Sequence, residues 1–150
     1  MASDAKQEIL AAERSAWAEL HGLIDSVSPS DADKPGYYAE GWSAKDALGH
    51  IGAWLAEAGI VLEQIYADSY RPDEIDIDAM NDAFLEAMKD EPYDRIRAQA
   101  MAARTRMLHA LSALPSVTED ALRWVRKSGP EHYGEHLPRL REWVDELQRR

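Results

Sequence analysis

The sequence contains no cysteine. Disulfide bonds, thiolate metal ligands and a cysteine nucleophile are therefore excluded. No apolar run approaches the ~20 residues that a membrane-spanning helix requires. The N-terminal stretch "MASDAKQEIL" also lacks the hydrophobic segment of a secretory signal peptide. We therefore expect a cytoplasmic protein that does not associate with membranes.

Basic residues are scarce as well. The chain has 17 Lys and Arg against 28 Asp and Glu, which gives a formal net charge of −11. Proteins that bind nucleic acid draw much of their affinity from clustered Lys and Arg, and no such cluster is present. We expect no nucleic-acid partner, and we interpret the acidity as a solvated surface rather than a recognition face.

The chain also lacks the alternating polar and apolar pattern of β-strands. Over its 150 residues, apolar side chains instead recur at three- and four-residue spacing, which is typical of amphipathic helices. This pattern predicts four long helices, over residues 4–27, 43–68, 93–114 and from about 128 onward, and a shorter helix over 76–89. The sequence therefore predicts one all-α domain covering residues 1–150. Its fold is a four-helix bundle with an extra short helix between the second and third long helices.

Three short stretches set the expected helix boundaries. Proline and glycine in "SPSDADKPGYY" (residues 28–38) predict a break after the first helix. Ser43 and Asp46 in "WSAKD" have the spacing of a capping box at the start of the second. Ser128 and Glu131 in "SGPE" form a similar pair, with Pro130 suited to a first turn, and predict that the last helix starts there.

The last of these helices opens with "EHYGEH", which places His132 and His136 four residues apart. Side chains at this spacing project from one face of a helix, and the same face continues through Leu140. Both imidazoles therefore point into the bundle, where two ring nitrogens can bind one divalent cation at ~2.0–2.2 Å. The alternative is a pair of core histidines that bond to one another or to water without a metal.

His50 is the expected third ligand, because it borders the buried stripe of the second long helix. Three imidazoles leave a coordination position open, as in catalytic sites, whereas structural zinc sites usually have four protein ligands. Such a site needs neutral rings, so we expect metal affinity to fall as the pH drops through ~6.5. His21 and His109 have no comparable neighbours, and we interpret them as surface or rim residues.

Four further residues are candidate substrate contacts. Asn81 can offer its amide, and Glu57, seven residues after His50, can serve as a hydrogen-bond partner of a ligand or as a general base. Each also has a simpler interpretation as a helix-surface residue. Trp54 and Tyr133 can contact a ligand or simply pack the bundle. The sequence identifies no catalytic residue beyond the expected metal ligands.

Two stretches carry a resemblance to a known family. "GWSAKDALGHIGAWLAE" (residues 41–57) and "HYGEHLPRLREWV" (residues 132–144) resemble the DinB-like superfamily of metal-binding four-helix bundles. Within it, the chain is similar to the N-terminal domain of mycothiol-dependent maleylpyruvate isomerases. The resemblance covers nearly the whole chain. It implies a divalent metal on His50, His132 and His136, the same three residues that spacing indicates.

The resemblance also implies an activity. Metal-bearing enzymes of the family activate the sulfur of a low-molecular-weight thiol, so we expect a thiol cosubstrate and a small electrophilic substrate. Imidazole ligands suit several metals, and zinc or nickel is the expected ion. The alternative function is a non-catalytic bundle that binds a metal or sequesters a small molecule. The resemblance and the five tryptophans, which a four-helix core cannot obviously bury, predict a homodimer.

Overall fold

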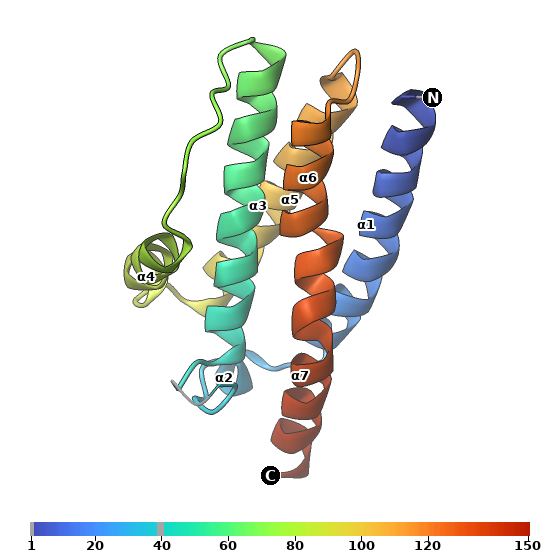
Figure 1. Cartoon of the computed structure of the whole chain (residues 1–150). Coiled ribbons are helices and arrows are strands. Elements are labelled where there is room, and N and C mark those ends of the chain that lie inside the picture. Colours follow the sequence, from blue (N-terminus) through green and yellow to red (C-terminus); the bar gives the residue numbers. More distant parts are fainter. Residues whose placement is uncertain (1, 39–40) are drawn as a thin grey trace.

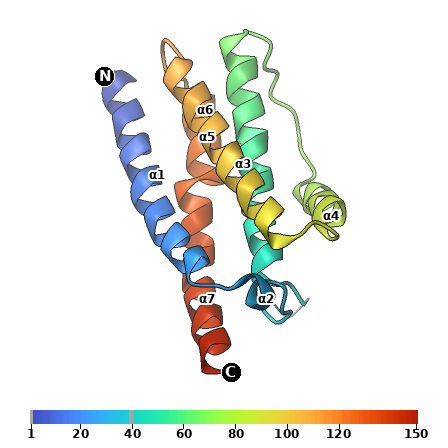
Figure 2. The same ribbon diagram turned by 180° about the vertical axis from the view of Figure 1, so that it is seen from behind.

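A computed structural model describes residues 2–38 and 41–150, and all regular structure in these residues is helical. Three long helices and a fourth, interrupted one pack side by side, and a short helix lies outside them (Figures 1 and 2). This confirms the predicted all-α four-helix bundle with a short helix between the second and third long ones. The elements are α1 (Ala2–Asp25), α2 (Pro29–Ala32), α3 (Ala44–Tyr66), α4 (Ile77–Met88), α5 (Tyr93–Ala113), α6 (Glu119–Ser128) and α7 (Pro130–Arg149).

The last helix starts where it was predicted to, because α7 begins at Pro130, but the predicted side-chain cap is absent and the preceding helix α6 was not predicted. The fourth rod of the bundle begins at α6, where the Thr118 hydroxyl accepts a hydrogen bond from the Ala121 amide at 3.1 Å. Ser128 is the buried last residue of α6, and α7 follows Gly129 with no side-chain cap. The two helices continue in nearly the same direction in Figure 1. His132 therefore lies midway along the fourth rod instead of at one end of the bundle.

The other predicted boundaries also agree with the structure. Ser43 and Asp46 form the expected capping box, with both reciprocal hydrogen bonds present at 3.2 and 3.0 Å. The break over residues 28–38 also contains the four-residue helix α2, which the sequence analysis missed. A helix this short shows no amphipathic repeat, and its signal is local: the Ser28 hydroxyl caps it by accepting from the Asp31 amide at 3.2 Å.

Helices α3 and α5 form the most closely packed pair of the bundle. At Gly52, a Cβ atom would lie 2.9 Å from the Cα atom of Ala100, so only glycine permits this separation. The close approach holds α3 against α5 next to His50, which is one of the candidate metal ligands. In the part of the chain that is described, no helix is both long enough and apolar enough to cross a membrane.

All five tryptophans are at least half-buried within the single chain. Trp54 and Trp143 are buried, and Trp17, Trp42 and Trp124 pack against the core with partial exposure. The expectation that a four-helix core does not fully bury all five tryptophans therefore agrees with the structure. The homodimer stays a prediction.

Candidate metal centre

Helices α3 and α7 bring His50, His132 and His136 together in the interior of the bundle. All three side chains are buried, with 5–8% of their surface exposed. The Nε2 atom of His132 lies 3.0 Å from Nε2 of His50 and 3.2 Å from Nε2 of His136. One nitrogen from each ring can be chosen so that the three atoms lie within 4.8 Å of one another. The two histidines of the i, i+4 pair thus meet the third across the helix interface.

The geometry of these rings fits a metal ion. Three nitrogens bound at 2.0–2.1 Å to a tetrahedral ion lie about 3.3 Å apart. Two of the three Nε2 separations, 3.0 Å from His132 to His50 and 3.2 Å from His132 to His136, are close to that value. The rings meet edge to face, with centroids 4.8 to 5.5 Å apart. The ring centroids of Trp42 and His50 lie 5.2 Å apart, so Trp42 covers one side of the histidine cluster.

Burial also keeps the three rings in the protonation state that a metal requires. Desolvation lowers the pKa of His50 and of His136 to about 4, and for His136 a charge on His50 adds to the effect. Desolvation, reinforced by charges on His136 and His50, lowers the pKa of His132 to about 3. The rings therefore stay neutral at pH 6, and the expected loss of metal affinity moves from pH 6.5 down to about pH 4.

The depressed pKa values predict that the metal-free protein is sensitive to acid. Below pH 6.5 the histidines of the unfolded chain take up protons, whereas the buried rings do not until the pH approaches 4. Because the unfolded state then binds more protons, the free energy of unfolding should decrease as the pH falls. Between pH 7 and pH 5 we expect a loss of about 2 kcal/mol for each buried histidine.

Urea unfolding of the metal-free protein at a series of pH values measures this loss. The variant His132→Gln has one buried imidazole fewer, so its stability should depend less steeply on pH over the same range. An unfolding free energy that stays constant from pH 7 to pH 5 in the wild type would contradict the prediction.

Two tyrosines that the sequence analysis did not single out hold the outer side of His136. The hydroxyl oxygen of Tyr37 lies 2.9 Å from Nδ1 of His136, and that of Tyr38 lies 3.1 Å from the same atom. Tyr37 is fully buried and Tyr38 half-buried. Both come from the irregular segment before α3, in "KPGYY", where no periodic pattern marks a residue as inward-facing. Their hydrogen bonds to a histidine 98 and 99 residues away have no local signature.

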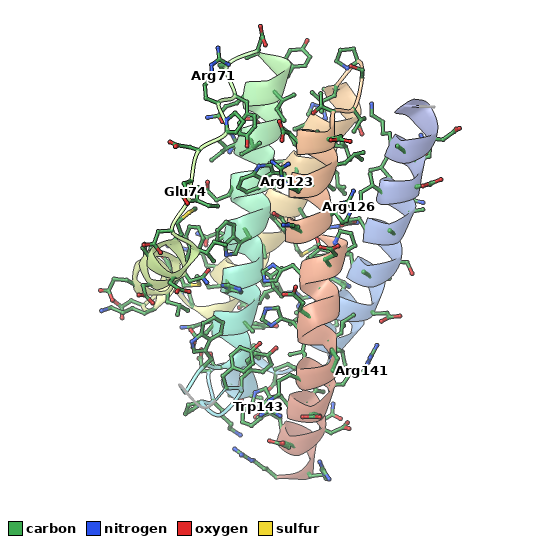
Figure 3. The ribbon with its side chains drawn as sticks, viewed as in Figure 1. Arg71, Glu74, Arg123, Arg126, Arg141 and Trp143 are labelled. Carbon is green, nitrogen blue, oxygen red and sulfur yellow. The ribbon has the colours of Figure 1, made fainter. Side chains whose placement is uncertain are left out.

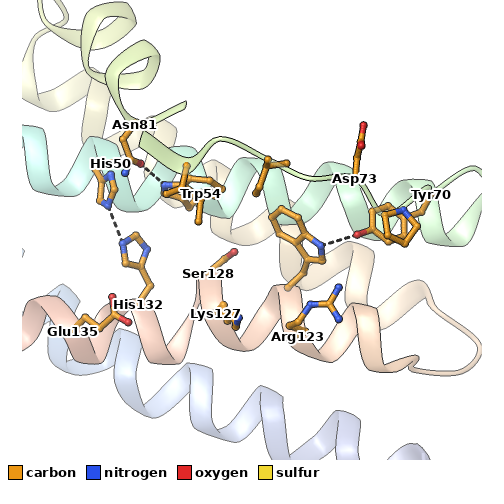
Figure 4. Close-up of a pocket in the computed structure, with 14 residues that line it drawn as sticks. His50, Trp54, Tyr70, Asp73, Asn81, Arg123, Lys127, Ser128, His132 and Glu135 are labelled. Carbon is orange, nitrogen blue, oxygen red and sulfur yellow. Dashed lines mark hydrogen bonds between the residues drawn. The ribbon is translucent and has the colours of Figure 1, made fainter. Parts of the chain in front are cut away.

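A cavity of about 480 Å³ adjoins the histidines between α3, α6, α7 and the connection 67–76 (Figure 4). This volume is within the range of small-molecule sites. Trp54 donates from Nε1 to the Asn81 side-chain oxygen at 2.8 Å, so two of the predicted substrate contacts lie in this wall together. The lining residues are His50, Trp54, Tyr70, Pro72, Asp73, Ile75, Ile77, Asn81, Arg123, Trp124, Lys127, Ser128, His132 and Glu135.

Glu57 and Tyr133 do not line this cavity. Glu57 lies two helical turns from His50, about 10 Å along the helix axis. Among the described side chains near the histidines, none forms a hydrogen bond with Glu57. Tyr133 is fully buried on another side of α7, where its hydroxyl donates to Glu13 at 3.3 Å and its ring packs on Trp17. The interpretation of Tyr133 as a packing residue agrees with this position.

The connection 67–76 and α6 supply the part of the cavity that sequence analysis missed. Trp124 donates from Nε1 to the Tyr70 hydroxyl at 3.2 Å and joins the two walls. Figure 3 shows Arg123 on the face of α6 toward α3, and Arg126 on the face toward α1. Arg123 and Lys127 therefore bring positive charge to the cavity, whereas Arg126 does not.

Comparison with known proteins agrees with this architecture. The family described as "Mycothiol maleylpyruvate isomerase N-terminal domain" matches residues 14–146. No curated protein matches the chain. A crystal structure of an uncharacterised protein from Escherichia coli UTI89 superposes with a TM-score of 0.80 over 94% of this chain and 93% of that one, at 14% identity. That likeness shows a shared fold. The family match covers most of the sequence, and the chain belongs to the mycothiol maleylpyruvate isomerase N-terminal domain family.

Proposed function

We propose that the protein is a metal-dependent enzyme that activates a low-molecular-weight thiol, of the mycothiol type, for reaction with a small electrophile. One observation carries the proposal: Nε2 atoms from α3 and α7 converge beside a cavity of small-molecule size. His50 and His132 belong both to the histidine cluster and to the cavity wall. A ligand in this cavity therefore reaches the position where a cation would be held.

The donor set indicates what the site does chemically. Three protein ligands, rather than four, are typical of catalytic zinc sites. A divalent cation held there would lower the pKa of a bound thiol and supply a thiolate near neutral pH. Because the chain has no cysteine, the reacting sulfur belongs to the cosubstrate. The buried rings of His50, His132 and His136 stay neutral and hold the ion without competing protons.

The cavity wall suits a small, partly apolar substrate. Trp54, Trp124 and Ile75 provide apolar surface, and the hydrogen bond between Trp54 and Asn81 fixes both side chains. Lys127 forms no ion pair within 4 Å with the described residues, so its charge is available to an anionic group of either substrate. Zinc or nickel is the proposed ion. We place the reaction in the cytoplasm, where thiols remain reduced.

The experiment has two stages. Protein purified without a histidine tag or chelator should contain about one zinc or nickel per chain by elemental analysis. It should then consume a generic electrophile such as 1-chloro-2,4-dinitrobenzene faster when mycothiol or another low-molecular-weight thiol is added, and chelation should remove this acceleration. Metal without thiol-dependent turnover would favour the alternative of a non-catalytic binding protein. Absence of metal after reconstitution would reject the enzyme and a metal-binding bundle, and would leave only a bundle that sequesters a small molecule.

A further inference from the structure

We propose that Tyr37 is a positioning residue for His136. Its hydroxyl accepts the Nδ1–H of the ring and so keeps the Nε2 lone pair directed at the other two histidines. This inference rests on the proposed metal site. It also makes a claim about the metal-free protein, namely which ring nitrogen of each histidine carries the hydrogen, and that claim can be tested with no metal present.

The hydrogen on each neutral ring can be assigned by following the partners. Nδ1 of His50 is buried and has no hydrogen-bond partner among the described residues, whereas its Nε2 lies 3.0 Å from Nε2 of His132. A buried N–H without an acceptor is costly, so the hydrogen of His50 is on Nε2. It is donated to Nε2 of His132, whose own hydrogen is on Nδ1, facing the carbonyl of Ser128.

This arrangement determines the tautomer of His136. The single lone pair on Nε2 of His132 already accepts from His50, and so it cannot accept a second hydrogen from His136 at 3.2 Å. The hydrogen of His136 is therefore on Nδ1, where two hydroxyl oxygens lie at 2.9 and 3.1 Å. Tyr37 has acceptors for its own hydrogen in the His136 carbonyl at 3.4 Å and in Tyr38. His132 and His136 are thus already in the tautomer that a metal at Nε2 requires.

The backbone around Tyr37 fixes the position of its hydroxyl. The amides of Gly36 and Tyr37 both donate to the Trp42 carbonyl, at 3.0 and 2.7 Å. Arg139, on α7 itself, donates to the Tyr37 carbonyl at 2.6 Å and to the Gly36 carbonyl at 2.9 Å. Gly36 adopts φ +122°, and a Cβ atom there would lie 2.7 Å from Trp143, so glycine is required at this turn. The segment that carries Tyr37 is therefore bound to the helix that carries His136.

The test compares four proteins: wild type, Tyr37→Phe, Tyr38→Phe and Tyr93→Phe. The first substitution removes the oxygen and keeps the ring, and we expect the affinity for Zn²⁺, measured by chelator competition, to fall 10- to 100-fold. Tyr38→Phe should have a smaller effect, because its contact is longer and half-exposed. Tyr93 is the matched control: it is equally buried, and its hydroxyl donates to the Ile24 carbonyl at 3.4 Å away from the site. Its variant should bind Zn²⁺ like the wild type.

Nitrogen-15 spectra of the metal-free protein provide the second readout, with the His136 signals assigned from the His136→Ala variant. We expect Nδ1–H tautomers for His132 and His136, an Nε2–H tautomer for His50, and loss of the single tautomer at His136 in Tyr37→Phe. Wild-type affinity in Tyr37→Phe, or an Nε2–H tautomer at His136 in the wild type, would overturn the inference. If the wild type itself fails to bind Zn²⁺, the proposed function is wrong, and the nitrogen spectra alone decide the role of Tyr37.

Discussion

Replacing His136 with alanine should reduce the affinity for Zn²⁺ by more than about 100-fold. Loss of a partner that only orients a ligand typically costs 10- to 100-fold, and loss of the ligand itself costs more. The side chain is buried, and its Nε2 lies 3.2 Å from that of His132, so no nearby water-exposed group can replace it without rearrangement. Chelator competition or isothermal titration calorimetry measures the difference.

His109→Ala is the matched control for this prediction. His109 is an exposed residue on α5, and it is not one of the three clustered histidines. Its removal should leave Zn²⁺ affinity and stoichiometry unchanged. Equal affinities for the wild type and His136→Ala would show that the metal binds elsewhere. A loss of affinity in His109→Ala would show the same.

Replacing Glu13 with alanine should lower the free energy of unfolding by about 3 kcal/mol or more. Glu13 has no exposed surface, and Arg104 on α5 donates to its carboxylate through two nitrogens at 2.6 to 3.1 Å. Tyr133 on α7 donates to the same carboxylate at 3.3 Å. Glu13 therefore links α1 to α5 through Arg104 and to α7 through Tyr133. Without Glu13, a partly buried guanidinium and a buried hydroxyl lose their acceptor.

The pair between Arg106 and Glu63 offers a control with the same chemistry. It also has two hydrogen bonds, at 2.8 and 2.7 Å, and also joins two helices, α3 and α5. Its side chains are about half exposed, so water screens the charges and replaces the lost partner. Glu63→Ala should therefore cost less than about 1 kcal/mol in urea unfolding. If Glu13→Ala and Glu63→Ala lowered the free energy of unfolding by similar amounts, burial of the ion pair would not determine the size of the decrease.

The bundle and the three clustered histidines could be predicted from the sequence because both depend on helical periodicity. Apolar residues at three- and four-residue spacing define the buried face of each helix. His132 and His136 share that spacing, so they had to point the same way as Leu140. His50 could be added because it borders the buried face of α3. Each of these inferences uses one helix at a time and needs no knowledge of how helices are joined.

The remaining parts of the site depend on contacts between segments that are distant in sequence. Tyr37 and Tyr38 come from an irregular segment, and Tyr70 and Asp73 from the connection 67–76, where side-chain directions follow from tertiary packing. Tyr133 follows His132 directly, which turns it about 100° around the helix axis and toward α1. The boundary at Gly129 and Pro130 was predicted, but α6, which precedes it in the same rod, was not.

The walls of the cavity come from helices and from an irregular connection, and these two kinds of structure differ in how well they tolerate substitution. The candidate metal ligands are buried on α3 and α7, so a substitution at any of the three disturbs the packed interior. Tyr70, Pro72, Asp73 and Ile75 belong to the connection 67–76, which is exposed along most of its length and outside the bundle core. Insertions and substitutions are tolerated far better in such a connection than in a helix core. Changes confined to these ten residues would therefore reshape one wall of the cavity while leaving the histidine cluster in place.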